Sequence, residues 1–173
     1  MVRMELNKDF WKNRSVFLTG HTGFKGGWIS LWLADMGAKV HGYSLEAIDN
    51  PSFFGETRLE ERLASSTIAD IQNFSTLKST MSLAKPSIII HMAAQPLVLE
   101  SYKSPIDTFK TNIIGTQNLV EACIENSVSK VVSLSTDKAS SPINLYGATK
   151  LCSDKLMINS NNITGRAKPI FSV

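Results

Sequence analysis

The chain has 173 residues, of which 43% are hydrophobic, and this is enough to build one ordinary domain with a substantial core. Its formal net charge of +3 is small, and the Lys and Arg residues are spread along the sequence. This pattern argues against a nucleic-acid surface and against a membrane-binding face. The expected partner is a small molecule, and the composition argues against a disordered or fibrous protein.

The two cysteines, Cys123 and Cys152, fall in helical patterns without metal-ligand spacing, so we expect buried, reduced thiols and no metal site. Residues 1–14 carry charges but no apolar core of signal-peptide type, and no later apolar run is long enough to cross a bilayer. These features predict a soluble, cytoplasmic protein.

Short apolar runs of strand length alternate with longer amphipathic stretches, which indicates a parallel sheet covered by helices on both faces. The predicted fold class is therefore α/β, a three-layer, doubly wound parallel sheet of Rossmann type. A polar, Pro-containing connection covers residues 49–61. Strands are expected at 15–19, 39–43, 67–69, 87–91, 130–135 and from 170, and helices at 28–36, 74–84, 107–125 and 146–159.

The last three residues, 171–173, have the composition of the start of a buried strand, without a cap or turn behind them. No repeat, low-complexity segment or linker divides the chain. We therefore expect residues 1–173 to form a single domain that belongs to a longer protein.

Three glycines, Gly20, Gly23 and Gly26, follow the first predicted strand and open the first helix. Gly20 permits a sharp turn, Gly23 lets the backbone approach a pyrophosphate, and Gly26 allows close packing of helix on strand. The helix N-terminus adds unpaired N–H groups and positive dipole potential. This loop predicts a dinucleotide site to which Thr22 and Phe24 also belong, and its Gly-x-x-Gly-x-x-Gly spacing points to the short-chain dehydrogenase/reductase type. The alternative is a glycine turn without a ligand.

The choice between NAD and NADP depends on the end of the second strand, where an acid favours NAD and an Arg favours NADP. Glu46 lies slightly beyond the end of the predicted strand at 39–43, and no basic residue follows until Arg58, so NAD is mildly favoured. Asp70, just past the third strand, can accept a hydrogen bond from the adenine amine or can form a turn. Ile71 beside it is assigned to the same cofactor site.

Tyr146 and Lys150 are four residues apart in a predicted helix, so both side chains can reach one site. A nearby ammonium favours the phenolate that tyrosine needs in order to remove a hydroxyl proton. Thr136, Asp137 and Lys138 lie at the carboxyl end of the preceding strand, where open α/β sheets assemble their sites. Asp137 and Lys138 offer an acid and a base beyond the needs of hydride transfer. The alternatives are a chance Tyr–Lys spacing and a strand end with solvated charges.

These strings resemble the extended short-chain dehydrogenase/reductases and, within them, the nucleotide-sugar 4,6-dehydratases. Residues 10–11, 19–27, 91–98 and 111–112 resemble the CDP-glucose 4,6-dehydratases. Residues 134–139 and 142–154 resemble the inverting UDP-N-acetylglucosamine 4,6-dehydratases. The resemblance covers nearly the whole chain and implies an NAD(P)-dependent lyase of polysaccharide biosynthesis that acts on one of these two nucleotide-sugars.

In this family NAD(P)+ takes hydride from sugar C4, water is eliminated across C5 and C6, and the hydride returns to C6. The resemblance makes Tyr146 the base at the C4 hydroxyl, assisted by Thr136. It makes Lys150 the residue that binds the nicotinamide ribose and tunes Tyr146. Lys138 becomes the base at C5 and Asp137 the acid for the leaving C6 hydroxyl.

The resemblance also implies roles around the cofactor. Ala93 and Ala94 leave room for it, Asn112 braces the site through its helix, and His91 is a buried strand-end residue rather than a catalyst. Two features depart from the family. The family continues past Val173 into a C-terminal substrate-binding part, and residues 99–100 are Leu-Glu where the CDP-glucose enzymes carry a basic residue.

Because of these departures, two other functions stay open. One is a non-catalytic fragment that holds NAD(P) or a partner subunit. The other is an epimerase or reductase, which needs Tyr146 and Lys150 but not the elimination pair. Full-length relatives commonly form dimers or larger rings, so a homo-oligomer is compatible with this reading.

Overall fold

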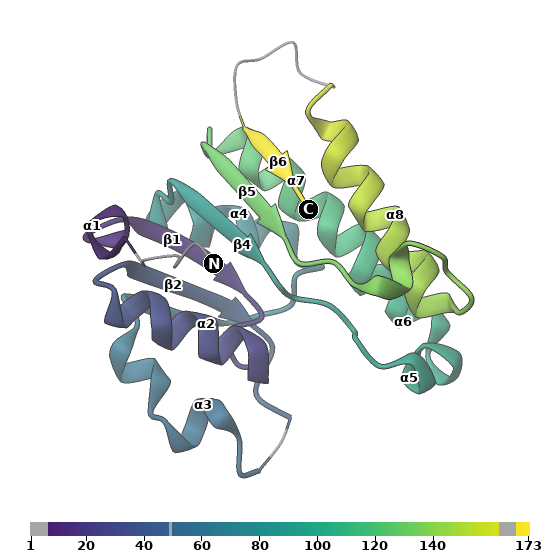
Figure 1. Ribbon diagram of the computed structural model, residues 1–173, viewed down its shortest axis with the longest axis horizontal. Coiled ribbons are helices and arrows are strands. Elements are labelled where there is room, and N and C mark those ends of the chain that lie inside the picture. Colours follow the sequence, from purple (N-terminus) through teal and green to yellow (C-terminus); the bar gives the residue numbers. More distant parts are fainter. Residues whose placement is uncertain (1–6, 49, 163–168) are drawn as a thin grey trace, which may run out of the picture.

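The computed structural model describes residues 7–48, 50–162 and 169–173 and contains one parallel sheet with helices packed against it (Figure 1). The strand order is β3-β2-β1-β4-β5-β6, so the direction of winding reverses between β1 and β4. The expected doubly wound, Rossmann-type fold is confirmed. The strands are β1 (Ser15–Thr19), β2 (Lys39–Ser44), β3 (Ser65–Ile68), β4 (Ile88–His91), β5 (Lys130–Ser133) and β6 (Ile170–Ser172).

Four longer helices connect these strands, and several short helical turns lie between them. The longer helices are α2 (Phe24–Asp35), α4 (Phe74–Ala84), α7 (Gly115–Glu125) and α8 (Leu145–Ser160). The short elements are α1 (Lys8–Trp11), α3 (Phe53–Glu56), η1 (Leu59–Arg62), α5 (Val98–Lys103), α6 (Pro105–Phe109), the π-helical η2 (Lys110–Ile114) and η3 (Asp137–Ala139).

Two apolar clusters form the core, one on each face of the sheet. The smaller cluster joins Val16, Leu18 and Val40 of the sheet to Leu33 of α2. The larger cluster joins the other face of the sheet to α4, α7 and α8. Its main buried members are Phe17, Tyr43, Leu77, Met81, Ile89, Leu119, Val120, Cys123, Val131, Met157 and Phe171.

In the described part of the chain, helices cover only one face of the sheet at β5 and β6. Around β5 and β6, Val131 and Phe171 are buried beneath α7 and α8, whereas Val132 and Ile170 are 44% and 56% exposed. Consecutive strand residues point to opposite faces. The face of β5 and β6 that turns away from α7 and α8 is therefore open to solvent.

Several expected boundaries need correction. The helix expected at 107–125 is interrupted by the π-helical η2 and is preceded by α5, which the sequence pattern did not predict. The helix expected at 28–36 begins four residues earlier, at Phe24. The connection at 49–61 contains α3 and η1, because Ser52 caps α3 and Leu59 is fully buried; residue 49 itself lies outside the described residues.

The two cysteines differ. Cys123 is fully buried as expected, and burial raises the pKa of its thiol well above its usual range. Cys152 is only half-buried, so that part of the expectation was wrong. In the described part of the chain, no helix combines the length and apolar character needed to cross a membrane.

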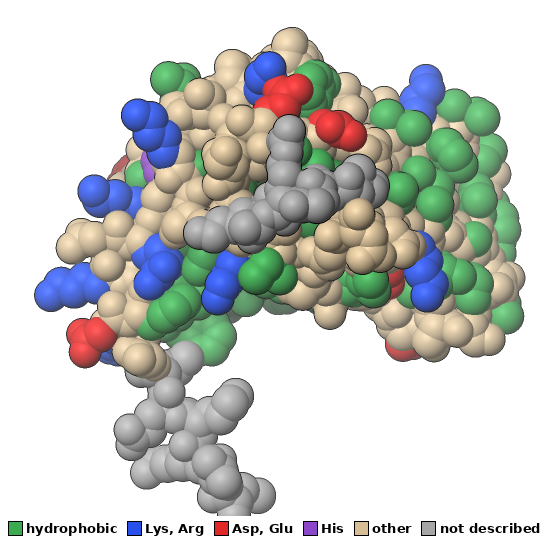
Figure 2. All heavy atoms as spheres, turned by 90° about the horizontal axis from the view of Figure 1, so that it is seen from above, with side chains coloured by type: hydrophobic (Ala, Val, Ile, Leu, Met, Phe, Trp, Pro, Cys, Tyr) green, Lys and Arg blue, Asp and Glu red, His purple; other side chains and the backbone are tan. Residues whose placement is uncertain are grey.

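Exposed hydrophobic side chains gather at one end of the molecule, the end that holds α5, α6 and the start of α8 (Figure 2). On and beside α5 and α6 the exposed residues are Leu97, Leu99, Tyr102, Ile106, Phe109 and Ile114. These short elements contribute few large side chains to the core, since only Ser101 of α5 and Thr108 of α6 are buried.

Candidate functional site

The glycine loop between β1 and α2 is shaped by close approaches of the backbone. Gly20 has φ +83°, and a Cβ on it would lie 3.0 Å from the backbone nitrogen of Ala93. A Cβ on Gly26 would overlap the carbonyl oxygen of Gly20. A Cβ on Gly23 would meet only that oxygen, at 3.5 Å. Gly20 and Gly26 are thus required by packing, whereas Gly23 keeps the outer side of the loop bare.

The first turn of α2 presents its backbone N–H groups at this bare side. Gly23 is the N-cap residue and supplies no side chain to accept from them. The Thr22 hydroxyl donates to the carbonyl oxygen of Leu45 at 2.8 Å and lies 2.9 Å from Ser44 Oγ, so it ties the loop to the end of β2. Free N–H groups at a helix N-terminus suit a phosphate group. The loop therefore fits the pyrophosphate of a dinucleotide.

Asp70 and Ile71 lie past β3, at the same edge of the sheet. Asp70 Oδ1 accepts from the backbone N–H of Gln72 at 2.8 Å, and the Asp70 carbonyl oxygen accepts from the Tyr43 hydroxyl at 2.9 Å. Asp70 thus forms the turn that the sequence allowed as an alternative, and its contact with adenine stays a prediction. The Ile71 side chain is buried against Gly115, and its carbonyl oxygen accepts from the Asn118 side chain at 3.2 Å, so its contact with a cofactor stays a prediction.

A buried chain of hydrogen bonds starts at the end of β1. Thr19 Oγ1 accepts from the backbone N–H groups of Met92 and Ala93, both at 3.1 Å, so its own proton is directed to His91 Nδ1 at 2.8 Å. His91 Nε2 then donates to Thr116 Oγ1 at 3.2 Å, which in turn donates to the Asn112 carbonyl oxygen at 2.6 Å. The tautomer of His91 follows from these partners.

His91 is held neutral in this chain. Burial, and then the charge of Lys150, lower its pKa to about 3. The expected buried position at the strand end is confirmed.

Asn112 extends the chain of hydrogen bonds to α8. Its side-chain NH2 group donates to Thr149 Oγ1 at 2.9 Å and to the Gln95 carbonyl oxygen at 3.1 Å, while its Oδ1 accepts from the Gln95 N–H at 2.8 Å. Thr149 Oγ1 donates to the Tyr146 carbonyl oxygen at 2.8 Å. The π-helical turn of η2 therefore places a buried amide between the loop after β4, which carries Ala93 and Ala94, and the helix that carries Tyr146.

Tyr146 and Lys150 lie one turn apart on α8, and both are buried, at 9% and 6% exposure. The Lys150 ammonium donates to the carbonyl oxygen of Leu134 at 2.7 Å. Burial lowers the pKa of Lys150, and the nearby charge of Asp154 opposes this effect. The predicted pair therefore lies on one helix face beside the end of β5.

Thr136, Asp137 and Lys138 follow β5, and η3 begins at Asp137. The Thr136 hydroxyl donates to Asp137 Oδ1 at 3.0 Å, and Lys138 Nζ lies 3.4 Å from the same oxygen. The hydrogen bond from Thr136, and then that from Lys138, lower the pKa of the Asp137 carboxyl. A Cβ on Gly147 would lie 2.5 Å from the Lys138 carbonyl oxygen, so η3 packs directly on the first turn of α8. The two groups of candidate catalytic residues thus lie together.

Comparison with known proteins relates this geometry to a family. The model of the family described as "Polysaccharide biosynthesis protein" matches residues 40–173, which include every candidate catalytic residue. The chain belongs to this family.

Two curated relatives are nucleotide-sugar dehydratases. The chain is 48% identical to CDP-glucose 4,6-dehydratase of Salmonella typhimurium over 134 residues, which are 77% of this chain and 37% of that enzyme. It is 42% identical to the inverting UDP-N-acetylglucosamine 4,6-dehydratase of Campylobacter jejuni over 121 residues, which are 70% of this chain and 31% of that enzyme. The expected resemblance is confirmed, and the matched segment spans about a third of each relative.

A solved structure shares the fold. UDP-glucose 4-epimerase from Brucella ovis, determined in complex with NAD, superposes with a TM-score of 0.77 at 25% identity, covering 88% of this chain and 49% of the epimerase. A solved protein with this architecture therefore binds NAD.

Sequence reasoning missed several polar residues of the site. Gln95, Thr116 and Thr149 complete the network around Asn112, and Ser135 pairs with Asp154, one turn after Lys150 on α8. His21 is also buried, and burial lowers its pKa to about 4; its Nε2 lies 2.9 Å from Ser66 Oγ. The types and spacing of these residues do not mark them in the sequence, because their hydrogen-bond partners lie far away along the chain.

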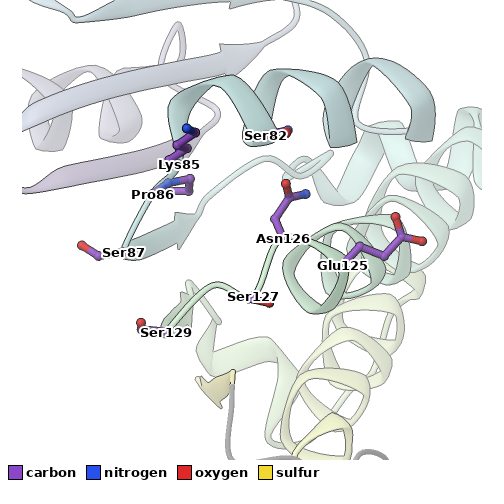
Figure 3. A pocket seen from close by; sticks show the side chains of 8 residues that line it. All are labelled: Ser82, Lys85, Pro86, Ser87, Glu125, Asn126, Ser127 and Ser129. Atoms are coloured by element: carbon purple, nitrogen blue, oxygen red, sulfur yellow. The ribbon is translucent and has the colours of Figure 1, made fainter.

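A separate hollow lies at the opposite edge of the sheet, where β4 and β5 begin (Figure 3). Ser82 and Lys85 come from the end of α4, and Glu125 and Asn126 from the end of α7. Glu125 is already paired with Lys78 at 2.6 Å. Ligands of open α/β sheets bind at the carboxyl ends of the strands. This hollow at the amino ends is therefore not the candidate site.

Proposed function

We propose that residues 1–173 are a single NAD(P)-binding domain and form the cofactor-binding part of a nucleotide-sugar 4,6-dehydratase. The substrate is CDP-glucose or UDP-N-acetylglucosamine, and the product is the 4-keto-6-deoxy sugar. One observation carries the proposal: η3, with Asp137 and Lys138, packs on the turn of α8 that holds Tyr146. Oxidation at C4 alone does not need that second acid–base pair.

The cofactor site is assigned to Gly20, Gly23 and Gly26, with the N–H groups of α2 on the pyrophosphate. When bound, the nicotinamide supplies reversible oxidation of the sugar. We propose NAD rather than NADP, since the loop meets β2 at Ser44 and Leu45, and neither offers a charge to a 2′-phosphate.

Tyr146 is assigned as the base that removes the C4 hydroxyl proton, with Thr136 hydrogen-bonded to the same hydroxyl. The proton affinity of a phenol must be lowered for this step at neutral pH. Lys150, one turn away and held by the Leu134 carbonyl, supplies the positive charge and a donor for the nicotinamide ribose.

The elimination of water is assigned to Asp137 and Lys138. In the free chain the two form an exposed ion pair. Once a substrate covers the pair, exclusion of water favours transfer of the proton from Lys138 to Asp137, because burial disfavours both charges. The neutral Lys138 amine then takes the C5 proton, and Asp137 gives its proton to the leaving C6 hydroxyl. Water departs, and the ion pair is restored.

The test is incubation of the chain with NAD+ and each nucleotide-sugar, followed by mass spectrometry for the product that has lost one water. Lys138→Met should abolish this product, whereas the matched surface variant Lys103→Met should form it at the wild-type rate. Calorimetric titration with NAD+ runs in parallel. A chain that binds NAD+ and forms no product would be a cofactor-binding fragment, and the assignment of dehydration to this chain would fail. A chain that binds no NAD+ would overturn the assignment of the cofactor site.

An epimerase of the same architecture is the second candidate, because the Brucella ovis protein that shares the fold is a UDP-glucose 4-epimerase. Epimerisation at C4 requires Tyr146 and Lys150 but no elimination. If Lys138→Met leaves turnover of a UDP-sugar unchanged, with inversion at C4 and no loss of water, the epimerase is correct.

A further inference from the structure

Asp154 is a buried carboxylate on α8 that the proposed mechanism does not use. Asp154 is 9% exposed and follows Lys150 by four residues, so the two side chains share a face of the helix. The Ser135 hydroxyl, just past β5, donates to Asp154 Oδ2. Among the described residues, Asp154 Oδ1 has no hydrogen-bond partner. A buried carboxylate with one unsatisfied oxygen is costly unless a charge nearby compensates it.

Lys150 is the matching buried cation. Its ammonium has a single hydrogen-bond acceptor within the described part of the chain, the uncharged carbonyl oxygen of Leu134 at 2.7 Å. Burial lowers the pKa of Lys150, and the charge of Asp154 raises it again. Each of the two opposite charges therefore offsets the cost of burying the other, although they form no direct ion pair in the described residues.

The other ionisable groups around α8 do not offer Lys150 a negative charge. Tyr146 lies one turn earlier on the same helix, and His91 at the end of β4 is neutral because its pKa is lowered to about 3. Glu100 on α5 is half-buried and accepts from Ser104 instead. The remaining charged side chains of the elements packed on α8, and Lys155 on α8 itself, are at the surface: Lys103, Asp107, Lys110, Glu121, Glu125, Asp137 and Lys138.

We propose that Asp154, held in place by Ser135, is a positioning residue that keeps Lys150 in its ammonium form, so that Lys150 can donate to the nicotinamide ribose. The assignment of Lys150 to the ribose rests on the function proposed above. The compensation between Asp154 and Lys150 is a property of the free chain and can be measured without a cofactor.

The first experiment is an NMR titration of the full 173-residue chain labelled with 13C at lysine Cε, in which the Lys150 signal is assigned by its loss in Lys150→Arg. Asp154→Asn keeps the shape of the side chain and its acceptor for Ser135 but removes the charge. Lys150 should then lose its proton at a lower pH than in the wild type. The exposed acid Glu121, replaced in Glu121→Gln, should leave the titration unchanged.

Two further variants keep the test decisive if Asp154→Asn folds poorly. Asp154→Glu retains the charge and should restore a titration close to that of the wild type. Ser135→Ala frees the carboxylate and should shift the Lys150 titration in the same direction as Asp154→Asn, by less. An unchanged Lys150 titration in Asp154→Asn, or in Ser135→Ala if the former does not fold, would overturn the proposal.

The second experiment measures NADH affinity by fluorescence. At a pH below the Lys150 titration of both proteins, as measured by NMR, wild type and Asp154→Asn should bind alike. At a pH between their two Lys150 titrations the variant should bind about tenfold more weakly, because a hydrogen bond from a charged donor is lost. Equal weakening at both pH values would indicate a merely structural role. If the wild type binds no NADH, the proposed function fails, while the lysine titration still decides the role of Asp154.

Discussion

Gly26 in the first turn of α2 lies directly against the carbonyl oxygen of Gly20, and a Cβ on Gly26 would overlap that oxygen. Gly23, three residues earlier, has room for a Cβ. Gly26 is therefore needed for packing, whereas Gly23 is expected to matter for cofactor binding. Gly26→Ala should lower the free energy of unfolding by about 2–3 kcal/mol, as expected for overpacking.

Gly23→Ala is the matched variant. It should change the free energy of unfolding by about 1 kcal/mol or less but should weaken NAD+ binding, because a methyl group would stand where the loop faces the pyrophosphate. Urea unfolding and calorimetric titration measure both quantities. Equal stability of the two variants would contradict the geometry of the loop, and undiminished binding by Gly23→Ala would contradict the assignment of the site.

His91 gives the chain a pH-dependent stability. Its pKa is about 3 when folded and 6.5 as a free side chain, so the unfolded chain binds the proton first as the pH falls. The stabilisation is complete above about pH 6.5 and is lost progressively towards pH 3. The free energy of unfolding should therefore fall more steeply between about pH 7 and pH 5 in the wild type than in His91→Gln.

His41→Gln serves as the control for this measurement, because His41 is only half-buried, whereas His91 is 2% exposed. It should keep most of the wild-type pH dependence of urea unfolding. If the slope of His91→Gln equals that of the wild type, His91 is not held neutral by the fold.

The Thr149 hydroxyl links the Asn112 amide to the Tyr146 carbonyl by two hydrogen bonds, and a substitution at Thr149 tests this link. Thr149→Val keeps the volume of the side chain but leaves one N–H of the Asn112 amide without its 2.9 Å acceptor and removes the side-chain donor to the Tyr146 carbonyl. The expected loss is about 2–3 kcal/mol of unfolding free energy, because buried polar groups become unpaired. Thr57→Val, which removes one hydroxyl bond to the Phe53 carbonyl in a half-buried position, should cost less than half as much. Thermal and urea unfolding compare them.

Leu45 tests the choice of cofactor. Its carbonyl oxygen anchors Thr22, and its side chain is 55% exposed at the end of β2. Leu45→Arg should raise the affinity for NADP+ about tenfold relative to NAD+, because a guanidinium there can pair with the 2′-phosphate. Leu83→Arg, on the exposed face of α4, should leave the ratio of the two affinities unchanged. An unchanged ratio in Leu45→Arg would place the adenosine ribose elsewhere.

Local patterns predicted much of this fold correctly. The bounds of β1 and α4 agree with the expected ranges of 15–19 and 74–84, because each is a run of uniform periodicity between clear start and stop signals. The glycine spacing predicted the loop at the start of α2, since Gly20 has φ +83° and Gly26 must lie against the Gly20 carbonyl within the same loop. Tyr146 and Lys150 were predicted to share a site because they are four residues apart on one helix.

The elements that were missed depend on distant contacts. The break in the helix expected at 107–125 contains Asn112, whose partners lie 17 and 37 residues away in the sequence. α5 and η1 are short, and buried residues such as Ser101 and Leu59 define them rather than a periodic pattern. Propensity over a few residues cannot specify such pieces, because most helical stability comes from tertiary packing.

The sequence by itself therefore determined the order of strands and helices, the glycine loop and the candidate pair on α8, because these depend on residues that are close along the chain. Only the tertiary structure decided that η3 packs on α8, that His91 is hydrogen-bonded to Thr19 and Thr116 and neutral, and that Ser135 pairs with Asp154 one turn after Lys150. Burial and charge are set by whichever side chains the fold brings together, and no local spacing records them.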